Sequence, residues 1–258
     1  MPGPIATARR ALNTVYRYVE PVFSPLAANT ALRAYPRYLR DRRAYQRLPG
    51  APKLSRLDDF PQLLDRSSAT PFEPHYTFQD GWAARQIAEL APEHHVDVGS
   101  RISFVIGLGA FVPVTFVDLR PLEIDLSGLS SVAGSILDLP FEDSSLASLS
   151  CLHVAEHIGL GRYGDPLDPS GTRRAAREMV RVLAPAGSLL VGLPVGAPRT
   201  EFNAHRIHDP REVPEMFEGV RLERFAGVRD DGTFAEDIEP AALAGSRWAC
   251  GLYRFVRD

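Results

Sequence analysis

Two imidazoles and one carboxylate lie close together in the stretch LHVAEHIGLGRYGDP, at His153, Glu156 and His157. If this stretch is a helix, their spacing of i, i+3 and i+4 places all three side chains on one face, toward one pocket. Such a set can bind a divalent ion that lowers the pKa of a hydroxyl group. Alternatively, one imidazole can take the hydroxyl proton as a general base. A structural role, in which Glu156 hydrogen-bonds the backbone and His157 supports the pocket from behind, also stays open.

Alternating strands and helices must position these groups. The apolar pattern predicts strands over 94–100, 113–119, 130–136, 146–152 and 188–195, with helices over 101–111 and 169–187. Ser170 is expected to cap the second of these helices, and Gly187 to end it. The last two strands, over 220–230 and 247–258, are expected to be antiparallel. Strands that are apolar on both faces indicate a mostly parallel sheet covered by helices, an α/β, Rossmann-like, doubly wound fold of seven strands.

Acidic and glycine residues end the first two expected strands. Asp97 and Gly99 close the first, and Asp118 closes the second, 21 residues after Asp97. A strand, a D-x-G turn and a helix together present backbone N–H groups and a carboxylate at the carboxyl edge of the sheet. An acid after the second strand is placed for ribose hydroxyls. The chain lacks the full G-x-G-x-x-G pattern there, which disfavours a dinucleotide-dependent dehydrogenase.

From residue 93 to residue 258, the ordered motifs resemble class I S-adenosylmethionine-dependent methyltransferases. Asp97 and Gly99 match the first motif of that superfamily, and Asp118 matches its ribose-binding acid. GSILDLPFEDSSLASLSC (134–151) is similar to its adenine-side segment and fourth strand, and RVLAPAGSLLVGLP (181–194) to the turn and strand that follow. The resemblance implies a transferase with S-adenosylmethionine as its cofactor.

The resemblance implies cofactor contacts along one edge of the sheet, at Asp97, Gly99, Ser100, Arg101, Asp118, Ser135, Ile136 and Leu152. The chain departs from the superfamily pattern at three of these positions. Ser100 and Arg101 follow Gly99 where further glycines are usual, and Arg101 is a candidate partner for the methionine carboxylate of the cofactor. Ser135 stands where an adenine-contacting acid is usual, and Asp138 is the alternative acid.

Three shorter motifs narrow the resemblance. HVAEHIGLGRYGDP (153–166), FNAHRIHDP (202–210) and VRDDGTF (228–234) resemble an uncharacterised methyltransferase-like family whose members often accompany polysaccharide-biosynthesis genes. That association implies O-methylation of a sugar or glycan hydroxyl, with a small molecule or a glycan as acceptor. The rival within this fold is a catalytically degenerate binding protein. The altered first motif favours that rival, and the histidine cluster disfavours it.

The histidine-rich stretch also resembles the Glu-x-x-Glu-His helix of ubiquinone-pathway O-methyltransferases and of small-RNA 2′-O-methyltransferases, which hold a divalent metal there. His153 replaces the first Glu of that pattern. The resemblance implies Mg²⁺ or Mn²⁺ held by His153, Glu156, His157 and, after the fifth strand, His208. It also makes RNA 2′-O-methylation a second rival function. For base catalysis, the candidate catalytic residues are His153, His157 and His205.

The N-terminal part differs in composition from the rest. Residues 1–55 hold nine arginines and Lys53 against Glu20 and Asp41, a net charge of +8, so a chain of net charge −3 carries −11 in its remainder. The basic part suits peripheral contact with an anionic membrane, or a solvated cap over the acidic remainder. The acidic remainder disfavours a nucleic-acid substrate.

The difference in composition between the N-terminal part and the remainder also predicts the domain organisation. Prolines are expected to divide the first 55 residues into short helices, followed by a connector over 48–76 and a helix over 79–90. We expect a helical, Arg-rich lid or homodimerisation region at 1–90 and a methyltransferase domain at 91–258. The sequence has no apolar run long enough to span a membrane, no secretory signal pattern and only two cysteines, which favours the cytoplasm.

Overall fold

The computed structural model describes residues 25–54, 59, 63 and 70–258, and the chain divides into two compact units, Met1–Pro71 and Phe72–Asp258. The larger unit begins at Phe72 and includes helix α3 (Pro74–Leu90), which packs against its sheet. Arg254 donates a hydrogen bond to the Gln86 side chain of α3 (3.1 Å), which attaches the helix to the last strand.

One long helix, α2, spans Pro25–Gln46 in the smaller unit. The sequence predicted short helices separated by prolines, and α2 corrects this, because Pro36 lies inside it. The proline ring removes one backbone hydrogen bond, but the alanines, leucines and arginines around it are good helix formers and continue the helix. The predicted helices before residue 25 lie outside the described residues. In the part of the chain that is described, no helix is both long and apolar enough to cross a membrane.

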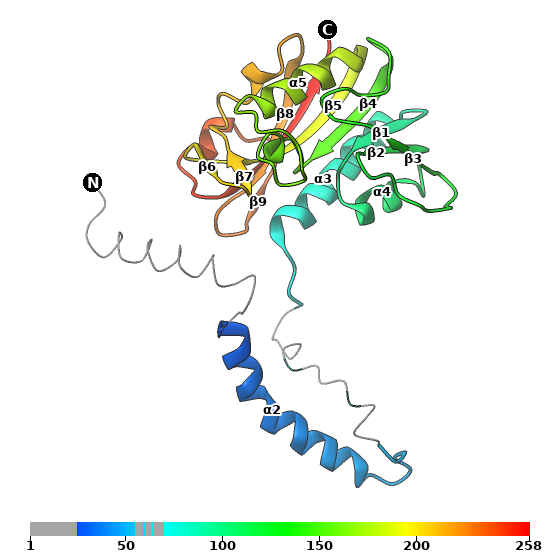
Figure 1. The fold of residues 1–258 in the computed structure, drawn as a ribbon, viewed down its shortest axis with the longest axis vertical. Helices are drawn as coiled ribbons and strands as arrows, with labels where there is room; N and C mark the ends of the chain where they lie inside the picture. Colours follow the sequence, from blue (N-terminus) through cyan, green and yellow to red (C-terminus); the bar gives the residue numbers. More distant parts are fainter. Residues whose placement is uncertain (1–24, 55–58, 60–62, 64–69) are drawn as a thin grey trace, which may run out of the picture. The chain divides into compact units, whose positions relative to one another are not determined.

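An eight-stranded sheet forms the centre of the larger unit, in the order β3-β2-β1-β4-β5-β10-β8-β9 (Figure 1). Its strands are β1 (His95–Val98), β2 (Val114–Asp118), β3 (Leu129–Ala133), β4 (Leu146–Leu152), β5 (Leu183–Val195), β8 (Arg221–Val228), β9 (Phe234–Ala235) and β10 (Ala249–Val256). The first five strands in this order, β3, β2, β1, β4 and β5, pair in parallel. Strand β10 pairs antiparallel with both β5 and β8. The mostly parallel sheet is confirmed. The predicted count of seven is wrong, because the short β9 adds an eighth strand beside β8.

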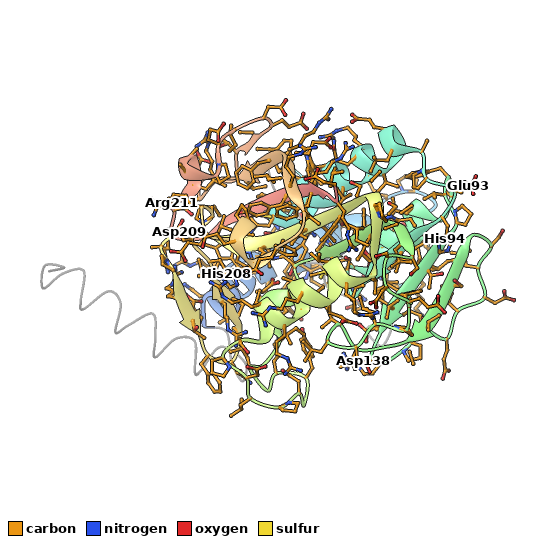
Figure 2. The ribbon with its side chains drawn as sticks, turned by 90° about the horizontal axis from the view of Figure 1, so that it is seen from above. Glu93, His94, Asp138, His208, Asp209 and Arg211 are labelled. Atoms are coloured by element: carbon orange, nitrogen blue, oxygen red, sulfur yellow. The ribbon has the colours of Figure 1, made fainter. Side chains whose placement is uncertain are left out.

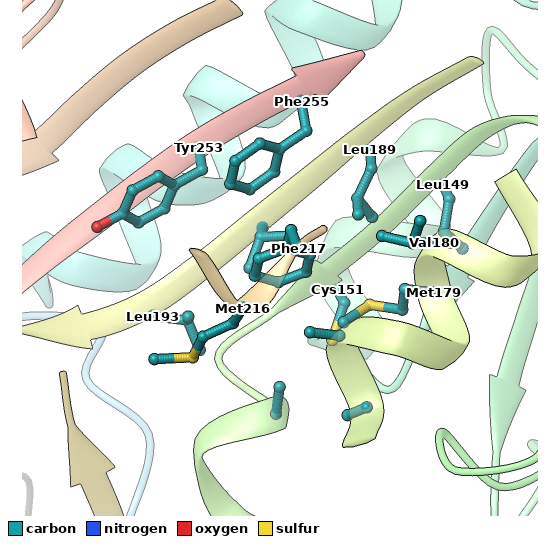
Figure 3. Packing of buried hydrophobic residues seen from close by; sticks show 14 of the residues in the cluster. Leu149, Cys151, Met179, Val180, Leu189, Leu193, Met216, Phe217, Tyr253 and Phe255 are labelled. Atoms are coloured by element: carbon teal, nitrogen blue, oxygen red, sulfur yellow. The ribbon is translucent and has the colours of Figure 1, made fainter. Parts of the chain in front are cut away.

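Side chains of the central strands alternate between two hydrophobic cores, as the period of two in a strand requires. In β5, Leu189 and Val191 belong to the core that includes helix α5 (Gly171–Val182), whereas Leu190 belongs to the core that includes α3 and helix α4 (Ile102–Leu108). Figure 3 shows the first core, in which Tyr253 and Phe255 of β10 lie beside Phe217 and near Met179 of α5. Both faces of the sheet are therefore buried.

The boundary between α5 and β5 differs from the prediction. Helix α5 ends at Val182, well before Gly187, because the chain from Leu183 onward already pairs with β4, where Leu183 is opposite Leu146. Ser170 does not cap the helix with its side chain; its hydroxyl donates to Asp168 instead (2.6 Å). A second sheet, the hairpin of β6 (Arg199–Glu201) and β7 (His205–Ile207), was not predicted.

Candidate active site

A cavity of about 710 Å³ opens at the carboxyl ends of β1, β2 and β4. The strand order reverses between β1 and β4, and in open α/β sheets ligands bind at such a reversal. Segments 98–102, 116–120 and 134–137 line the cavity after successive strands, and His153 and His157 line it after β4. Six of the predicted cofactor residues are in this lining: Gly99, Ser100, Arg101, Asp118, Ser135 and Ile136.

Asp97 lies behind the wall of this cavity and is fully buried. Its carboxylate accepts hydrogen bonds from the backbone N–H of Ser100 (3.0 Å), from the Ser100 hydroxyl (2.7 Å) and from the Ser150 hydroxyl. Burial raises the pKa of Asp97 to about 6, although these donors oppose the increase. Asp97 thus holds the turn that carries Gly99, and its predicted contact with the cofactor stays a prediction. Leu152, also predicted as a contact, is buried in the core with α3 and α4.

The hydrogen-bond network behind the cavity continues to His95. Its Nδ1 lies 2.8 Å from Ser148 Oγ, and its Nε2 lies 2.9 Å from Ser150 Oγ. Because Ser150 gives its one hydroxyl proton to Asp97, it accepts from His95, so the neutral imidazole carries its proton on Nε2. Burial lowers the pKa of His95 to about 3. His95 is thus a neutral, structural part of the first strand.

Two charged side chains at the cavity are held by specific contacts. Asp118 Oδ1 accepts the backbone N–H of Arg120 (2.8 Å), which fixes the carboxylate at the end of β2. The Arg101 guanidinium lies 5.0 Å from the centre of the Tyr76 ring and 3.8 Å from Asp80 Oδ2. Both partners of Arg101 belong to α3, so this helix orients the only cationic side chain of the first motif.

The loop after β3 brings Ser135 to the cavity and keeps Asp138 out of it. Ser135 Oγ accepts the backbone N–H of Leu137 (3.1 Å), which shapes a tight turn. Asp138 is exposed and does not line the cavity. At Gly134, a Cβ atom would lie 2.7 Å from Val117 Cγ1, so only glycine lets the loop pass this close to β2.

The chain after β4 does not form the regular helix that the sequence predicted. His153 has a left-handed backbone (φ 56°), and only Ala155–His157 form one turn of 3-10 helix. The backbone N–H of His153 donates to the carbonyl oxygen of Gly192 in β5 (2.9 Å), which anchors this conformation. The three polar side chains still converge, but through this turn and not through the i, i+3, i+4 face of a helix.

His153 and Glu156 form a buried ion pair. His153 Nδ1 lies 2.9 Å from Glu156 Oε1, and the two side chains are 5% and 1% exposed. Burial disfavours the charge on each, yet each pKa moves toward the charged form. Cys250 and Glu156 raise the pKa of His153 well above its ordinary value, and His153 and His157 lower the pKa of Glu156. While it carries this charge, His153 has no lone pair with which to accept a proton.

His157 is held in one tautomer by a backbone carbonyl. Its Nδ1 donates to the carbonyl oxygen of Ala204 (2.6 Å), so the lone pair of the neutral ring is on Nε2. The Arg162 guanidinium donates to the same carbonyl oxygen (3.1 Å). Nε2 of His157 lies 3.7 Å from Glu156 Oε1, within reach of its negative charge. This geometry makes Nε2 of His157 a proton acceptor beside the cavity.

A second, smaller cavity of about 100 Å³ adjoins the first. Its walls include His153 and His157, which also line the larger cavity, so the two spaces meet at these side chains. The remaining lining residues come from α3 and the residue that caps it, from the stretch 156–162 and from the C-terminal part of the chain: Glu73, His75, Tyr76, Glu156, Arg162, Pro194, His205 and Trp248. His205, a predicted catalytic residue, therefore lies in the smaller cavity.

The predicted metal centre is not formed. Within the described ranges, no group of three or more His, Cys, Asp or Glu side chains is placed to hold a metal ion. His208 lines neither cavity: its backbone pairs with β5, where its N–H donates to the carbonyl oxygen of Pro194 (3.1 Å). Figure 2 shows His208 beside Asp209 and Arg211, which form an ion pair of 2.6 Å. Because His208 is outside both linings, it does not join His153, Glu156 and His157, and the predicted set of four ligands does not assemble.

Arg206 joins the hairpin of β6 and β7 to the glycine-rich loop 158–168. Its guanidinium is buried and donates to the carbonyl oxygens of Ile158 (2.5 Å) and Asp168 (2.8 Å). These carbonyls stand at the two ends of the loop. The loop carries Tyr163 into the lining of the larger cavity and Arg162 into that of the smaller one.

Sequence reasoning did not identify Trp248 or Ala204 as parts of this site. Trp248 packs edge-on against His205, with ring centroids 4.2 Å apart, and donates from Nε1 to His75 Nδ1 (2.9 Å). Ala204 acts through its carbonyl oxygen, which no side-chain pattern reveals. The motif FNAHRIHDP did indicate the right segment. It was singled out for its histidines, however, and not for the backbone carbonyl that contacts His157.

Comparisons with known proteins agree with this architecture. Residues 143–243 match a family described as "Caenorhabditis protein of unknown function, DUF268". This segment includes His153, His157 and His205. No curated protein matches the chain in sequence. The predicted kinship with a polysaccharide-associated family stays a prediction.

Solved structures show the fold. The N-methyltransferase NodS from Bradyrhizobium japonicum WM9, in complex with S-adenosyl-L-homocysteine, is similar with a TM-score of 0.50 and 17% identity, over 72% of this chain and 88% of that one. The [4+2]-cyclase SpnF is similar with a TM-score of 0.51 and 12% identity, over 69% of this chain and 81% of that one. The chain therefore has the α/β, Rossmann-like methyltransferase fold. Because a cyclase shares this fold, function must be argued from the site.

Proposed function

We propose that the protein is an S-adenosylmethionine-dependent methyltransferase that acts on a hydroxyl group of a sugar or glycan. The observation that carries this proposal is the meeting of two cavities at His153 and His157. The larger cavity is placed for the cofactor and the smaller one for the acceptor. The reacting atoms would then meet beside an imidazole that can take a proton.

The larger cavity fits the chemistry of S-adenosylmethionine. Asp118 offers a carboxylate at the end of β2 for ribose hydroxyls, and Arg101 offers a cation for the methionine carboxylate. Phe116 and Ile136 supply apolar surface for adenine. Gly99 has a left-handed backbone (φ 69°), and a Cβ there would lie 3.1 Å from Val154 Cγ1, so the glycine keeps the turn after β1 close to the turn after β4.

His157 is the proposed general base. Bound S-adenosylmethionine supplies an electrophilic methyl group. As the hydroxyl oxygen bonds to the methyl carbon, its proton passes to Nε2 of His157, and the electrons of the broken S–C bond stay on sulfur. The Ala204 carbonyl keeps Nε2 unprotonated in the neutral ring before the reaction. The negative charge of Glu156 then stabilises the imidazolium that forms.

Charge supports a neutral acceptor. The unit Phe72–Asp258 contains 17 arginines and 27 acidic residues, a net charge of −10, which repels polyanions such as RNA. The walls of the smaller cavity are polar and aromatic, with Tyr76 and Trp248 among them. Aromatic side chains with polar edges suit a sugar, which has both apolar C–H groups and hydroxyls.

Calorimetric titration of the full-length protein with S-adenosylhomocysteine tests the cofactor half of the proposal. We expect saturable binding with a dissociation constant on the order of micromolar. Incubation with methyl-labelled S-adenosylmethionine and a panel of neutral methyl glycosides tests the acceptor half. Absence of S-adenosylhomocysteine binding would contradict the proposal. Binding without label transfer to any glycoside, but with transfer to amines, would replace the hydroxyl acceptor by a nitrogen acceptor.

A further inference from the structure

The smaller cavity contains a buried carboxylate oxygen without a hydrogen-bond partner. Glu156 uses Oε1 to contact His153, while its Oε2 is buried and unpaired. Almost all buried polar atoms in native proteins are paired by protein, water or ligand. The Glu156 side chain is only 1% exposed and lines this cavity, so a group that enters the cavity is the natural donor to Oε2.

A second acceptor atom stands next to this carboxylate. Nε2 of His157 has its lone pair available, because Nδ1 donates to the carbonyl oxygen of Ala204. Nε2 lies 3.7 Å from Oε1 of Glu156. Two neighbouring acceptors in one small space require two neighbouring donors from the ligand.

The charges around the cavity select a neutral ligand. Arg162 and the charged His153 are balanced by Glu73 and Glu156, which gives a net charge of zero for the lining. An amine is protonated near pH 7 and would add an unbalanced positive charge beside Arg162 and His153. A hydroxyl is neutral, and it donates to an acceptor while its own oxygen can still accept from Arg162.

The volume limits how much of the ligand enters. At about 100 Å³, the cavity has room for roughly three water-sized groups of about 30 Å³ each. That space holds one edge of a sugar ring, with two hydroxyls on neighbouring carbons, and not the whole ring. The rest of the acceptor must extend outside the cavity.

We infer that the smaller cavity binds two adjacent hydroxyl groups of the acceptor, so that the substrate class is a vicinal diol. His157 accepts the proton of the hydroxyl that becomes methylated, and Glu156 Oε2 accepts a hydrogen bond from its neighbour. The inference rests on the proposed function and makes Glu156 the residue that distinguishes a diol from a single alcohol.

A matched pair of small probes tests this assignment. We would titrate the full-length protein, saturated with S-adenosylhomocysteine, with cis-cyclohexane-1,2-diol and with cyclohexanol, and follow the side-chain signals of His153 and His157 by NMR. We expect the diol to bind at least about tenfold more tightly than cyclohexanol, as one hydrogen bond to a charged group implies. Equal affinities for the two probes would overturn the inference, and this comparison needs no variant.

Glu156→Gln tests the carboxylate itself, with Glu142→Gln as the control at an exposed glutamate outside both cavities. We expect Glu156→Gln to remove most of the preference for the diol and Glu142→Gln to retain it. A preference that persists in folded Glu156→Gln would overturn the assignment to Glu156. Failure of S-adenosylhomocysteine to bind the wild-type protein would instead contradict the proposed function, because that titration does not involve either probe.

Discussion

Nδ1 of His157 lies 2.6 Å from the carbonyl oxygen of Ala204, and this single contact determines which nitrogen of the imidazole can accept a proton. The two residues are 47 positions apart in the chain and meet only because the hairpin of β6 and β7 approaches the turn after β4. A backbone carbonyl oxygen can only accept, so in the neutral ring the proton is on Nδ1 and the lone pair is on Nε2. The position of the hairpin is therefore part of the proposed catalytic apparatus.

Replacing the proposed base should greatly lower turnover while leaving the affinity for the cofactor product nearly unchanged. We expect His157→Gln to lower kcat by about 10² to 10⁴, the usual contribution of a general base. The affinity for S-adenosylhomocysteine should stay within about threefold, because the conserved side-chain volume keeps the wall of the cavity. Calorimetry and a methyl-transfer assay on the same preparation check both halves. Equal losses in binding and in turnover would show that His157 supports the cofactor and does not act as the base.

The carboxylate at the end of β2 should contribute to cofactor affinity. Asp118→Ala removes the acid that lines the cavity beside Arg120, and we expect S-adenosylhomocysteine binding to weaken by about 1 to 3 kcal/mol. Asp138→Ala is the matched control, since Asp138 is exposed and outside the lining. Calorimetric titration of the two variants distinguishes them. Similar affinities for both would mean that Asp118 does not bind the ribose.

The start of α5 should tolerate no side chain at Gly171. A Cβ there would lie 2.1 Å from the carbonyl oxygen of Ile158, a backbone atom that cannot move aside without displacing the loop 158–168. We expect Gly171→Ala to destabilise the fold by about 1 to 3 kcal/mol, the usual cost of overpacking. Gly245→Ala is the control, because no atom lies within 4 Å of the added Cβ. Urea unfolding followed by circular dichroism measures both; unchanged stability in Gly171→Ala would show that the helix start shifts freely.

Acid should destabilise the protein partly through His95. Burial lowers its pKa to about 3 in the folded protein from an ordinary value of 6.5, so the unfolded chain binds a proton that the folded chain does not. The stability that His95 contributes is thus fully present above pH 6.5 and is lost progressively as pH falls toward 3. Each pH unit in this window costs about 1.4 kcal/mol for one such group.

Urea unfolding at several pH values between 7 and 4 checks this expectation. His95→Gln keeps a polar side chain between Ser148 and Ser150 but cannot take up a proton in this range. We expect the free energy of unfolding of this variant to fall less steeply with decreasing pH than that of the wild-type protein. The difference in slope should correspond to the uptake of about one proton on unfolding. Parallel slopes for the two proteins would show that His95 does not titrate differently in the folded and unfolded states.

The fold was predictable where local pattern dictates structure. The apolar runs that became β1, β2, β4 and β5 are buried on both faces, and such runs are visible in the sequence. The end of α5 was not, because Leu183 leaves the helix to pair with Leu146, a partner far away in the chain. The continuous α2 was missed because Pro36 normally signals a break.

The site was predictable only in part, for a similar reason. Asp118 and His157 were identified from their place after a strand, which the sheet topology converts into proximity. The metal hypothesis assumed that His153 begins a helix, whereas its left-handed backbone is imposed by the hydrogen bond to Gly192. Trp248 directly precedes β10, whose first residue, Ala249, pairs with Val195 at the end of β5, and no spacing in the sequence encodes that pairing.

The guanidinium of Arg206 ties the ends of the loop 158–168 to the hairpin of β6 and β7. Because one buried cation holds both segments, neither can open while the other stays closed without leaving that cation unpaired. The two segments should therefore behave as a single cooperative unit of local unfolding, with amide protons that exchange at a shared opening free energy. Exchange of substrate and product through this side of the molecule would then be governed by one equilibrium and not by two independent gates.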